Sequence, residues 1–180
     1  MASYFIDGVE GWSALGYDAN ADTNGYTSRC NSYSVHLSRF GFPDGCLRRP
    51  DDTCGAMFFQ AAAVFLGDQS AVYGGTLEYT LKLEQVPLYV RLADVVMRSA
   101  NGTTLVYKSG FVPTESQDWK RVVVPLEASA WHRDRVSEAP PTEAEMRAVL
   151  TSLRAIHIRG EYFDGGDEAY LDNVLLRSVR

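Results

Sequence analysis

The sequence predicts an all-β fold, an antiparallel β-sandwich or barrel that carries a single short helix. One long segment, residues 76–84, alternates strictly between apolar and polar side chains, and several β-rich segments follow it, separated by turn-forming residues. Only residues 142–153 have apolar side chains at the spacing of a helix face. Many short strands joined by turns are typical of sandwiches and barrels.

Length and composition indicate one globular domain over residues 1–180. Hydrophobic residues make up 46% and charged residues 22% of the 180, which is ordinary for a domain with its own core. The net charge is −6 and the basic residues are scattered, so we expect no nucleic-acid partner. No apolar run approaches the roughly 20 residues of a membrane span, so we expect no membrane insertion. The first residues lack the pattern of a secretion signal, which leaves the compartment of a parent protein open.

The alternating segment sets the expected register of one strand. Its apolar positions, expected to be buried, are Leu77, Tyr79, Leu81 and Leu83. Its polar positions, expected to be exposed, are Glu78, Thr80 and Lys82. Further strands are expected at residues 4–6, from residue 12, and at 88–96, 103–107, 119–126, 155–162 and 169–177.

Turn-rich segments and one helix complete the prediction. Residues 18–25, DANADTNG, are expected to form a loop, and residues 32–55 a long surface excursion with one short β-like run. Thr142 followed by Glu145 is a capping box, so we expect a helix that packs Leu150 against the core.

The segment 58–84, FFQAAAVFLGDQSAVYGGTLEYTLKLE, contains an aromatic pair, FLGD and YGG before the alternating strand. It resembles the signature of the laminin IV (laminin B) domain, and later segments follow in that family's order, ending with LDNV at 171–174. The resemblance covers about two thirds of the chain. It implies a jelly-roll, galactose-binding-like β-sandwich related to carbohydrate-binding modules, with Trp119 and Trp131 in the core.

The resemblance also implies a function. We expect a non-catalytic adhesion or interaction module of a larger extracellular or cell-surface protein, binding protein or glycan, and monomeric as a domain. The first alternative is a dedicated carbohydrate-binding module, which would line one face with exposed aromatic side chains. A less favoured alternative is a jelly-roll glycoside hydrolase, which needs two carboxylates about 5 to 10 Å apart in a cleft.

The sequence offers no catalytic motif to support an enzyme. It contains no GxSxG, HExxH or Walker pattern. His36, His132 and His157 are far apart in the sequence, and His157 lies in a β-rich segment where a structural role is expected. We therefore expect no catalytic residues.

Two groups of acidic residues are candidates for a metal site. Oxygen-bearing side chains occupy alternate positions in the loop at Asp18, Asn20, Asp22 and Asn24. A plain polar loop is favoured there, because Thr23 and Arg29 stand where an EF-hand has Gly and Glu. The second group is Asp7 and Asp172.

The resemblance implies a role for the second group, Asp7 and Asp172, as ligands of a structural metal. In carbohydrate-binding jelly rolls the terminal strands lie side by side, and a structural calcium is often held by an N-terminal acid and the Asp of an LDNV-like strand. We therefore predict that any metal is structural Ca²⁺, held by Asp172 with Asp7. In the alternative, Asp172 only accepts hydrogen bonds from backbone amides.

The cysteines leave their pairing open. Cys30, Cys46 and Cys54 form an odd set, so one disulfide with one thiol and three thiols both remain. No CxxC pair or nearby histidine spacing supports zinc.

Overall fold

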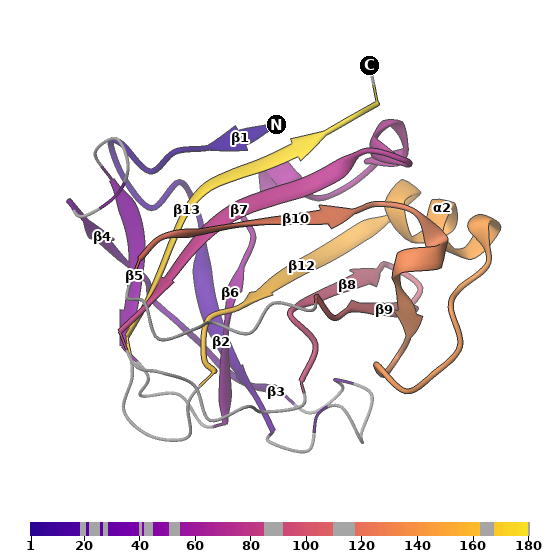
Figure 1. Cartoon of the computed structure of the whole chain (residues 1–180), viewed down its shortest axis with the longest axis horizontal. Helices are drawn as coiled ribbons and strands as arrows, with labels where there is room; N and C mark the ends of the chain where they lie inside the picture. The colour runs from indigo at the N-terminus through magenta and orange to yellow at the C-terminus, as the bar shows by residue number, and fades with distance from the viewer. Residues whose placement is uncertain are drawn as a thin grey trace.

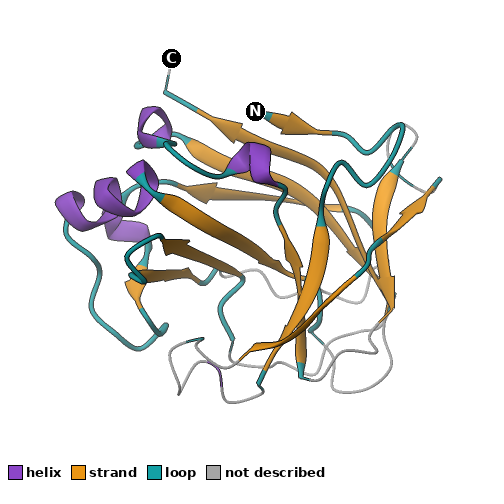
Figure 2. Cartoon of the chain, turned by 180° about the vertical axis from the view of Figure 1, so that it is seen from behind, coloured by secondary structure: helices purple, strands orange, loops and turns teal. Residues whose placement is uncertain are grey.

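The described residues form two antiparallel β-sheets that pack face to face (Figure 1). This computed structural model describes residues 1–18, 21, 26, 29–39, 41, 45–50, 55–84, 92–109, 118–162 and 168–179. Figure 2, the view from behind, shows the helix α2 (Glu143–Thr151) at one end of the sandwich. The predicted β-sandwich is confirmed.

The first sheet, called sheet A, has six strands in the described part of the chain. Their order is β10 (Lys120–Pro125), β7 (Thr76–Leu83), β13 (Glu168–Arg177), β5 (Cys46–Pro50) and β4 (His36–Ser38), with β1 (Ala2–Ser3) also paired to β13.

The second sheet, sheet B, has seven strands in the same described ranges. Their order is β11 (His132–Arg133), β9 (Thr104–Tyr107), β8 (Val95–Ser99), β12 (Leu153–Arg159), β6 (Ala56–Gln60), β2 (Ser13–Tyr17) and β3 (Arg29–Tyr33). Three 3-10 helices, η1 (Ala63–Phe65), η2 (Ser70–Val72) and η3 (Ala128–Ala130), lie in the connections.

The first and last strands lie side by side, as the resemblance implied. β1 pairs with β13, and the terminal ammonium group donates a hydrogen bond to the carbonyl oxygen of Leu176 at 2.8 Å. The prediction of a strand at residues 4–6 is wrong. β1 ends at Ser3, and Phe5 has a φ of 53°, in the left-handed region where a strand cannot continue.

The alternation in β7 is confirmed on its apolar face. The four side chains expected to be buried are at most 7% exposed, and they pack in the core between the sheets. On the other face Thr80 and Lys82 are half-buried. The expectation that Glu78 is exposed is wrong, because two arginine side chains cover its carboxylate.

The long surface excursion expected for residues 32–55 is wrong in part. Its described residues include β5, which lies between β13 and β4 within sheet A. Leu47 of β5 is fully buried opposite Leu171, whereas Arg48 lies opposite Tyr170. The Gly and Pro residues around β5 suggested a loop, but pairing with β13 stabilises a strand there.

Two other strand and helix ends differ from expectation. Of the strand expected at residues 88–96, residues 88–91 lie outside the described residues, and the described strand β8 begins at Val95. The helix ends at Thr151, because Leu153 already belongs to β12 and its carbonyl oxygen accepts the N–H of Gly67 at 2.8 Å.

The tryptophans differ in burial. Trp131 is fully buried and donates its indole N–H to the carbonyl oxygen of Pro125 at 2.7 Å. Trp119 is only half-buried, although the resemblance implied a core position. The reason is its register: Lys120 lies opposite Leu81, which places Trp119 just before β10 and beside Tyr170 on sheet A.

The helix α2 begins with the predicted capping box. The Thr142 hydroxyl accepts the backbone N–H of Glu145, and the Glu145 carboxylate accepts the backbone N–H of Thr142. The same carboxylate pairs with Arg133 of β11 at 2.8 Å. Leu150 is fully buried, as expected. Glu145 therefore connects the start of the helix to sheet B.

This cap predicts an acid-sensitive contribution to stability. The Arg133 guanidinium, together with the bonds from Thr142, lowers the pKa of Glu145 from 4.5 to about 2. A carboxyl group with a lowered pKa in the folded state stabilises the fold above its unfolded pKa, and this contribution disappears as the pH falls toward 2. We expect Glu145→Gln to lower the thermal midpoint at pH 7, and the difference from wild type to shrink between pH 4.5 and 2.

The variant Glu143→Gln, which loses only an exposed pair with Arg147, is the control. A difference that stays constant over this range would contradict the prediction.

Candidate functional site

The outer face of sheet B is covered by the chain itself. Its outward side chains and residues of two connecting segments form a second apolar cluster of Leu15, Tyr17, Ala21, Tyr26, Ala56, Phe58, Leu92, Ala93, Val96 and Val106. Tyr17, Tyr26 and Phe58 are fully buried, with ring centroids 5.1 to 6.3 Å apart in edge-to-face contact. These rings are therefore closed to a ligand.

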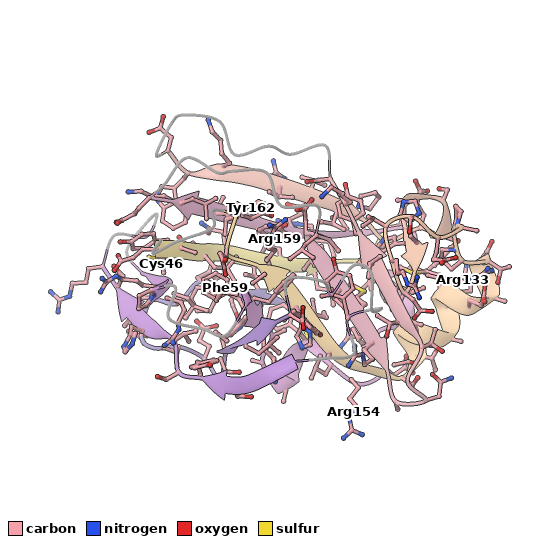
Figure 3. All side chains as sticks on the ribbon, turned by 90° about the horizontal axis from the view of Figure 1, so that it is seen from below. Cys46, Phe59, Arg133, Arg154, Arg159 and Tyr162 are labelled. Atoms are coloured by element: carbon pink, nitrogen blue, oxygen red, sulfur yellow. The ribbon has the colours of Figure 1, made fainter. Side chains whose placement is uncertain are left out.

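Buried polar side chains of β12 contact the residues of this apolar cluster. His157 is fully buried, as a structural histidine should be, and its Nδ1 lies 2.8 Å from the Tyr17 hydroxyl. Arg159 is 1% exposed, and its guanidinium lies 4.2 Å from the ring centre of Tyr162. Figure 3 shows Arg159 and Tyr162 next to each other in the view from below. Arg159 also donates to the carbonyl oxygen of Leu92, which is part of the covering cluster.

A buried carboxylate fixes the segment after β9. Asp94 accepts hydrogen bonds from the backbone and hydroxyl of Ser109, both at 2.7 Å, and from the Tyr162 hydroxyl at 3.0 Å. Burial, with the charge of Asp94, raises the pKa of Tyr162 and of Tyr79 well above the usual value. Both phenols therefore stay protonated, and this group acts as structural support.

Sheet B offers no pair of acids for glycoside hydrolysis. Within their described bounds its strands contain no Asp or Glu. A hydrolase of this fold needs two carboxylates that face one cleft.

The outer face of sheet A is different, because polar and aromatic side chains form a row across its strands. In register, Lys82 of β7 lies opposite Tyr170 of β13, and Tyr170 lies opposite Arg48 of β5. The Lys82 ammonium is 5.5 Å from the Tyr170 ring centre, and the Trp119 ring is 6.4 Å from it. Arg48 forms an ion pair with Glu168.

A second group on this face combines charge and apolar surface. We call it the sheet A patch, and it consists of Glu78, Arg121, Val123, Leu175 and Arg177. Arg121 lies 2.7 Å and Arg177 3.3 Å from the two oxygens of the Glu78 carboxylate. The bond from Arg121 lowers the pKa of Glu78, so this carboxylate is ionised at neutral pH.

The sheet A patch presents cations to solvent. The side chains of Arg121 and Arg177 are 67% and 53% exposed, whereas that of Glu78 is 10% exposed. Val123, opposite Glu78 in the register, is 45% exposed, and Leu175 on the other side of Glu78 is half-buried. Two cations therefore lie beside accessible apolar surface, a combination typical of protein interfaces.

Seven large apolar side chains are exposed in the described ranges. They are Met1, Tyr4, Ile6, Leu37, Val64, Val123 and Val179. Val123 lies on the outer face of sheet A by its register with Glu78. Met1 and Tyr4 adjoin β1, Val179 follows β13, and Leu37 of β4 lies opposite the core residue Leu47. The two sheets thus differ: the outer face of sheet B is closed by its own chain, whereas that of sheet A carries the exposed side chains of the sheet A patch.

The predicted metal residues are placed as follows. Asp172 is 1% exposed in β13, and its Oδ1 accepts the backbone N–H of Asn173 at 2.6 Å. Asp7 is exposed and lines an open pocket together with Leu37 and Arg39. Asp18 is exposed. Asn20, Asp22 and Asn24 lie outside the described residues.

Calcium binding by these residues stays a prediction, because their placement does not test it. Among the described residues no three His, Cys, Asp or Glu side chains converge as a metal group. The buried Asp172 carboxylate, at the bulge where β13 passes from β5 to β1, is the position that would suit a cation. Cys46 is a buried thiol, and the side chains of Cys30 and Cys54 lie outside the description.

Sequence reasoning missed the sheet A patch. Arg121 and Arg177 lie far apart in the chain and meet only because β10 and β13 flank β7. The signal that was present is the alternation of β7, which puts Glu78 on the same face as both arginines. Among the described residues, every helix is too short or too polar to pass through a bilayer.

The architecture defines a jelly-roll β-sandwich. It is similar to the L4b domain of human laminin alpha-2, with a TM-score of 0.71, 13% identity, and coverage of 98% of this chain and 100% of that domain. It is also similar to the family 11 carbohydrate-binding module of the Clostridium thermocellum cellulase Lic26A-Cel5E, with a TM-score of 0.56, 17% identity, and coverage of 99% and 94%. Residues 58–180 match the family model Laminin B (Domain IV), and the chain belongs to this family.

Sequence relatives agree with this assignment. The chain is 28% identical over 165 residues to laminin subunit gamma-1 of Xenopus tropicalis, covering 90% of this chain and 9% of that protein. It is 27% identical over 190 residues to laminin subunit gamma-2 of Equus caballus, covering 100% and 14%. The chain thus spans a small part of the length of these relatives.

Proposed function

We propose that this domain is a non-catalytic interaction module of a larger extracellular protein, and that it binds a protein or glycan partner through the outer face of sheet A. The contrast between the two outer faces carries the proposal. Aromatic side chains on sheet B are buried under the chain's own segments, whereas sheet A presents exposed arginine and apolar side chains. Membership of the laminin B family supports the extracellular location.

Binding by variants with a matched control tests this function. Labelled wild-type domain is applied to a glycan array and to a panel of immobilised extracellular-matrix proteins. The test variant is Arg121→Ser with Val123→Ser on sheet A. The control is Arg154→Ser with Val64→Ser, two exposed residues outside that sheet; Figure 3 shows Arg154 projecting away from the sandwich.

We expect the wild type to bind at least one component, the control to bind equally, and the sheet A variant to bind about tenfold more weakly, because it removes a cation and an apolar contact. Absence of binding to every glycan and protein would overturn the function. Equal binding by both variants would overturn the assignment to sheet A.

A dedicated carbohydrate-binding module is the alternative, and the partly accessible ring of Trp119 is the observation that supports it. The half-buried Trp119 lies at the end of the row on sheet A, beside the hydrogen-bonding groups around Tyr170. Tyr170 itself is 5% exposed, so its ring is not open to a sugar. If the ligand is a glycan, Trp119→Ala should abolish binding on the array and leave binding to the protein panel unchanged.

A structural calcium ion at Asp172 remains part of the proposal. It would reduce the cost of burying this carboxylate where the terminal strands meet, because a divalent cation is a strong partner for carboxylate oxygen. We expect a chelator to lower the thermal midpoint of the wild type. Asp172→Asn should abolish this sensitivity, and Asp18→Asn should leave it intact. A midpoint that responds neither to calcium nor to chelator would show that Asp172 is a hydrogen-bonding residue only.

A further inference from the structure

The hairpin between β8 and β9 carries a sequence that the proposed binding function does not use. Residues 101–103 are Asn-Gly-Thr, and Asn101 is the one asparagine of the sequence with Ser or Thr two positions later. This spacing is the acceptor pattern for N-linked glycosylation in proteins that pass through the secretory pathway. Modification of a folded surface also requires that the asparagine is accessible.

The hairpin places Asn101 at its exposed tip. Asn101 and Gly102 are exposed and Thr103 is half-buried. Gly102 has a φ of 91°, and a side-chain atom added there would meet nothing within 4 Å. The space beside Gly102, next to the acceptor asparagine, is therefore open.

Hydrogen bonds orient the Asn101 side chain. The backbone N–H of Thr103 donates to its Oδ1 at 3.1 Å, and the Ser99 hydroxyl bonds to the same oxygen. A backbone N–H can only donate, so the atom that faces it is the oxygen and the remaining amide group is Nδ2. The oxygen is thus held against the turn, and the nitrogen, which is the reacting atom, is left for solvent.

The turn that presents this group is anchored at both ends. The backbone N–H of Ser99 donates a hydrogen bond to the carbonyl oxygen of Thr103, with 3.0 Å between nitrogen and oxygen, and this bond closes the hairpin. The N–H of Ala100 donates to the carbonyl oxygen of Ser152, just after α2, at 2.8 Å. The tip is therefore a defined surface feature next to the helix.

We propose that Asn101 is an N-glycosylation site, and that its donor is an oligosaccharide carried on a lipid pyrophosphate. In this reaction Nδ2 forms a bond to the anomeric carbon of the sugar and loses one proton. The bond from that carbon to the pyrophosphate oxygen breaks, and the lipid pyrophosphate leaves with the electron pair. The Thr103 hydroxyl completes the acceptor pattern.

This site has a consequence for the binding surface. The hairpin belongs to sheet B, on the opposite sheet from the sheet A patch. A glycan at its tip adds a bulky hydrophilic group beside α2, at one end of the sandwich. The accessible face of sheet A would then be left for partners. The inference rests on the extracellular location in the proposed function and not on the identity of the ligand.

The test is the mass of the chain after entry into the secretory pathway. The full chain, fused behind a cleavable secretion signal, is translated in the presence of microsomes and also secreted from cultured mammalian cells. We expect the wild type to carry the added mass of one glycan. An amidase that hydrolyses the bond between asparagine and an N-glycan should release this mass and convert Asn101 to Asp in the peptide map.

Four variants make the test specific. Asn101→Gln and Thr103→Ala should lose the added mass completely, whereas Thr103→Ser, which keeps the acceptor pattern, should retain it. Asn173→Gln changes an asparagine outside any such pattern and should retain it also. Imported and secreted wild-type chain with the mass of the polypeptide alone, or a glycan that persists in Asn101→Gln, would overturn the inference. Either result leaves the binding test of the proposed function unaffected, so the two can fail separately.

Discussion

Replacing Gly75 with alanine is expected to destabilise the domain by about 3 kcal/mol or more, because there is no room for a side chain at this position. A Cβ atom on Gly75 would lie 1.9 Å from the carbonyl oxygen of Arg177 and 3.0 Å from that of Val72. Two hydrogen bonds hold the backbone of Gly75 in place. Its N–H donates to the carbonyl oxygen of Val72, and its carbonyl oxygen accepts the N–H of Leu126. Denaturant unfolding monitored by tryptophan fluorescence measures the effect.

The control for this prediction is a glycine with free space around it. A Cβ on Gly8 would meet nothing within 4 Å, so Gly8→Ala should change the unfolding free energy by no more than about 0.5 kcal/mol. Equal stability of the two variants would mean that the end of β13 can move away from Gly75, and that the second glycine of the YGG element is not required for packing.

Leu150→Ala should cost about 2 to 5 kcal/mol of unfolding free energy, because it removes a fully buried side chain and leaves a cavity between α2 and the sheets. Thr151→Ala is the matched control. Thr151 is exposed on the same helix, and alanine has the higher helix propensity, so we expect a change close to zero. An unchanged denaturation midpoint for Leu150→Ala would contradict the packing of α2.

The sequence predicted those parts of the fold in which local pattern and long-range packing agree. In β7 the alternation correctly separated the buried Leu77 and Leu81 from the outer face. The capping box at Thr142 correctly predicted where α2 begins. Both signals lie within a few residues of one another, so they can be recognised without knowledge of the tertiary structure.

Elements that depend on distant partners were predicted poorly. β5 has two adjacent arginines and a proline, and its place in sheet A depends on pairing with β13, more than a hundred residues away. Glu78 is buried because Arg121 and Arg177 reach it from the neighbouring strands. The alternation of a strand assigns the face of a side chain, but the burial of that side chain depends on strand neighbours that the sequence order does not reveal.

The candidate surface was hidden for the same reason. Aromatic residues such as Tyr17 and Phe58 alternate outward on sheet B, which by pattern alone would suggest a platform for sugar rings. Their closure depends on Tyr26 and Leu92, which come from segments outside the sheet. The contrast between a closed and an accessible face is therefore a property of the assembled sandwich.

The pairing of the first and last strands has a mechanical consequence. Figure 1 shows both chain ends at the same end of the sandwich, and Met1 and Leu176 exchange two backbone hydrogen bonds there. Tension between the two ends would therefore load this pair first and peel β1 from β13 one bond at a time, each with a net worth of about 1 kcal/mol. A stretched molecule should show a small early extension at low force, before the much larger step in which sheet A separates from sheet B.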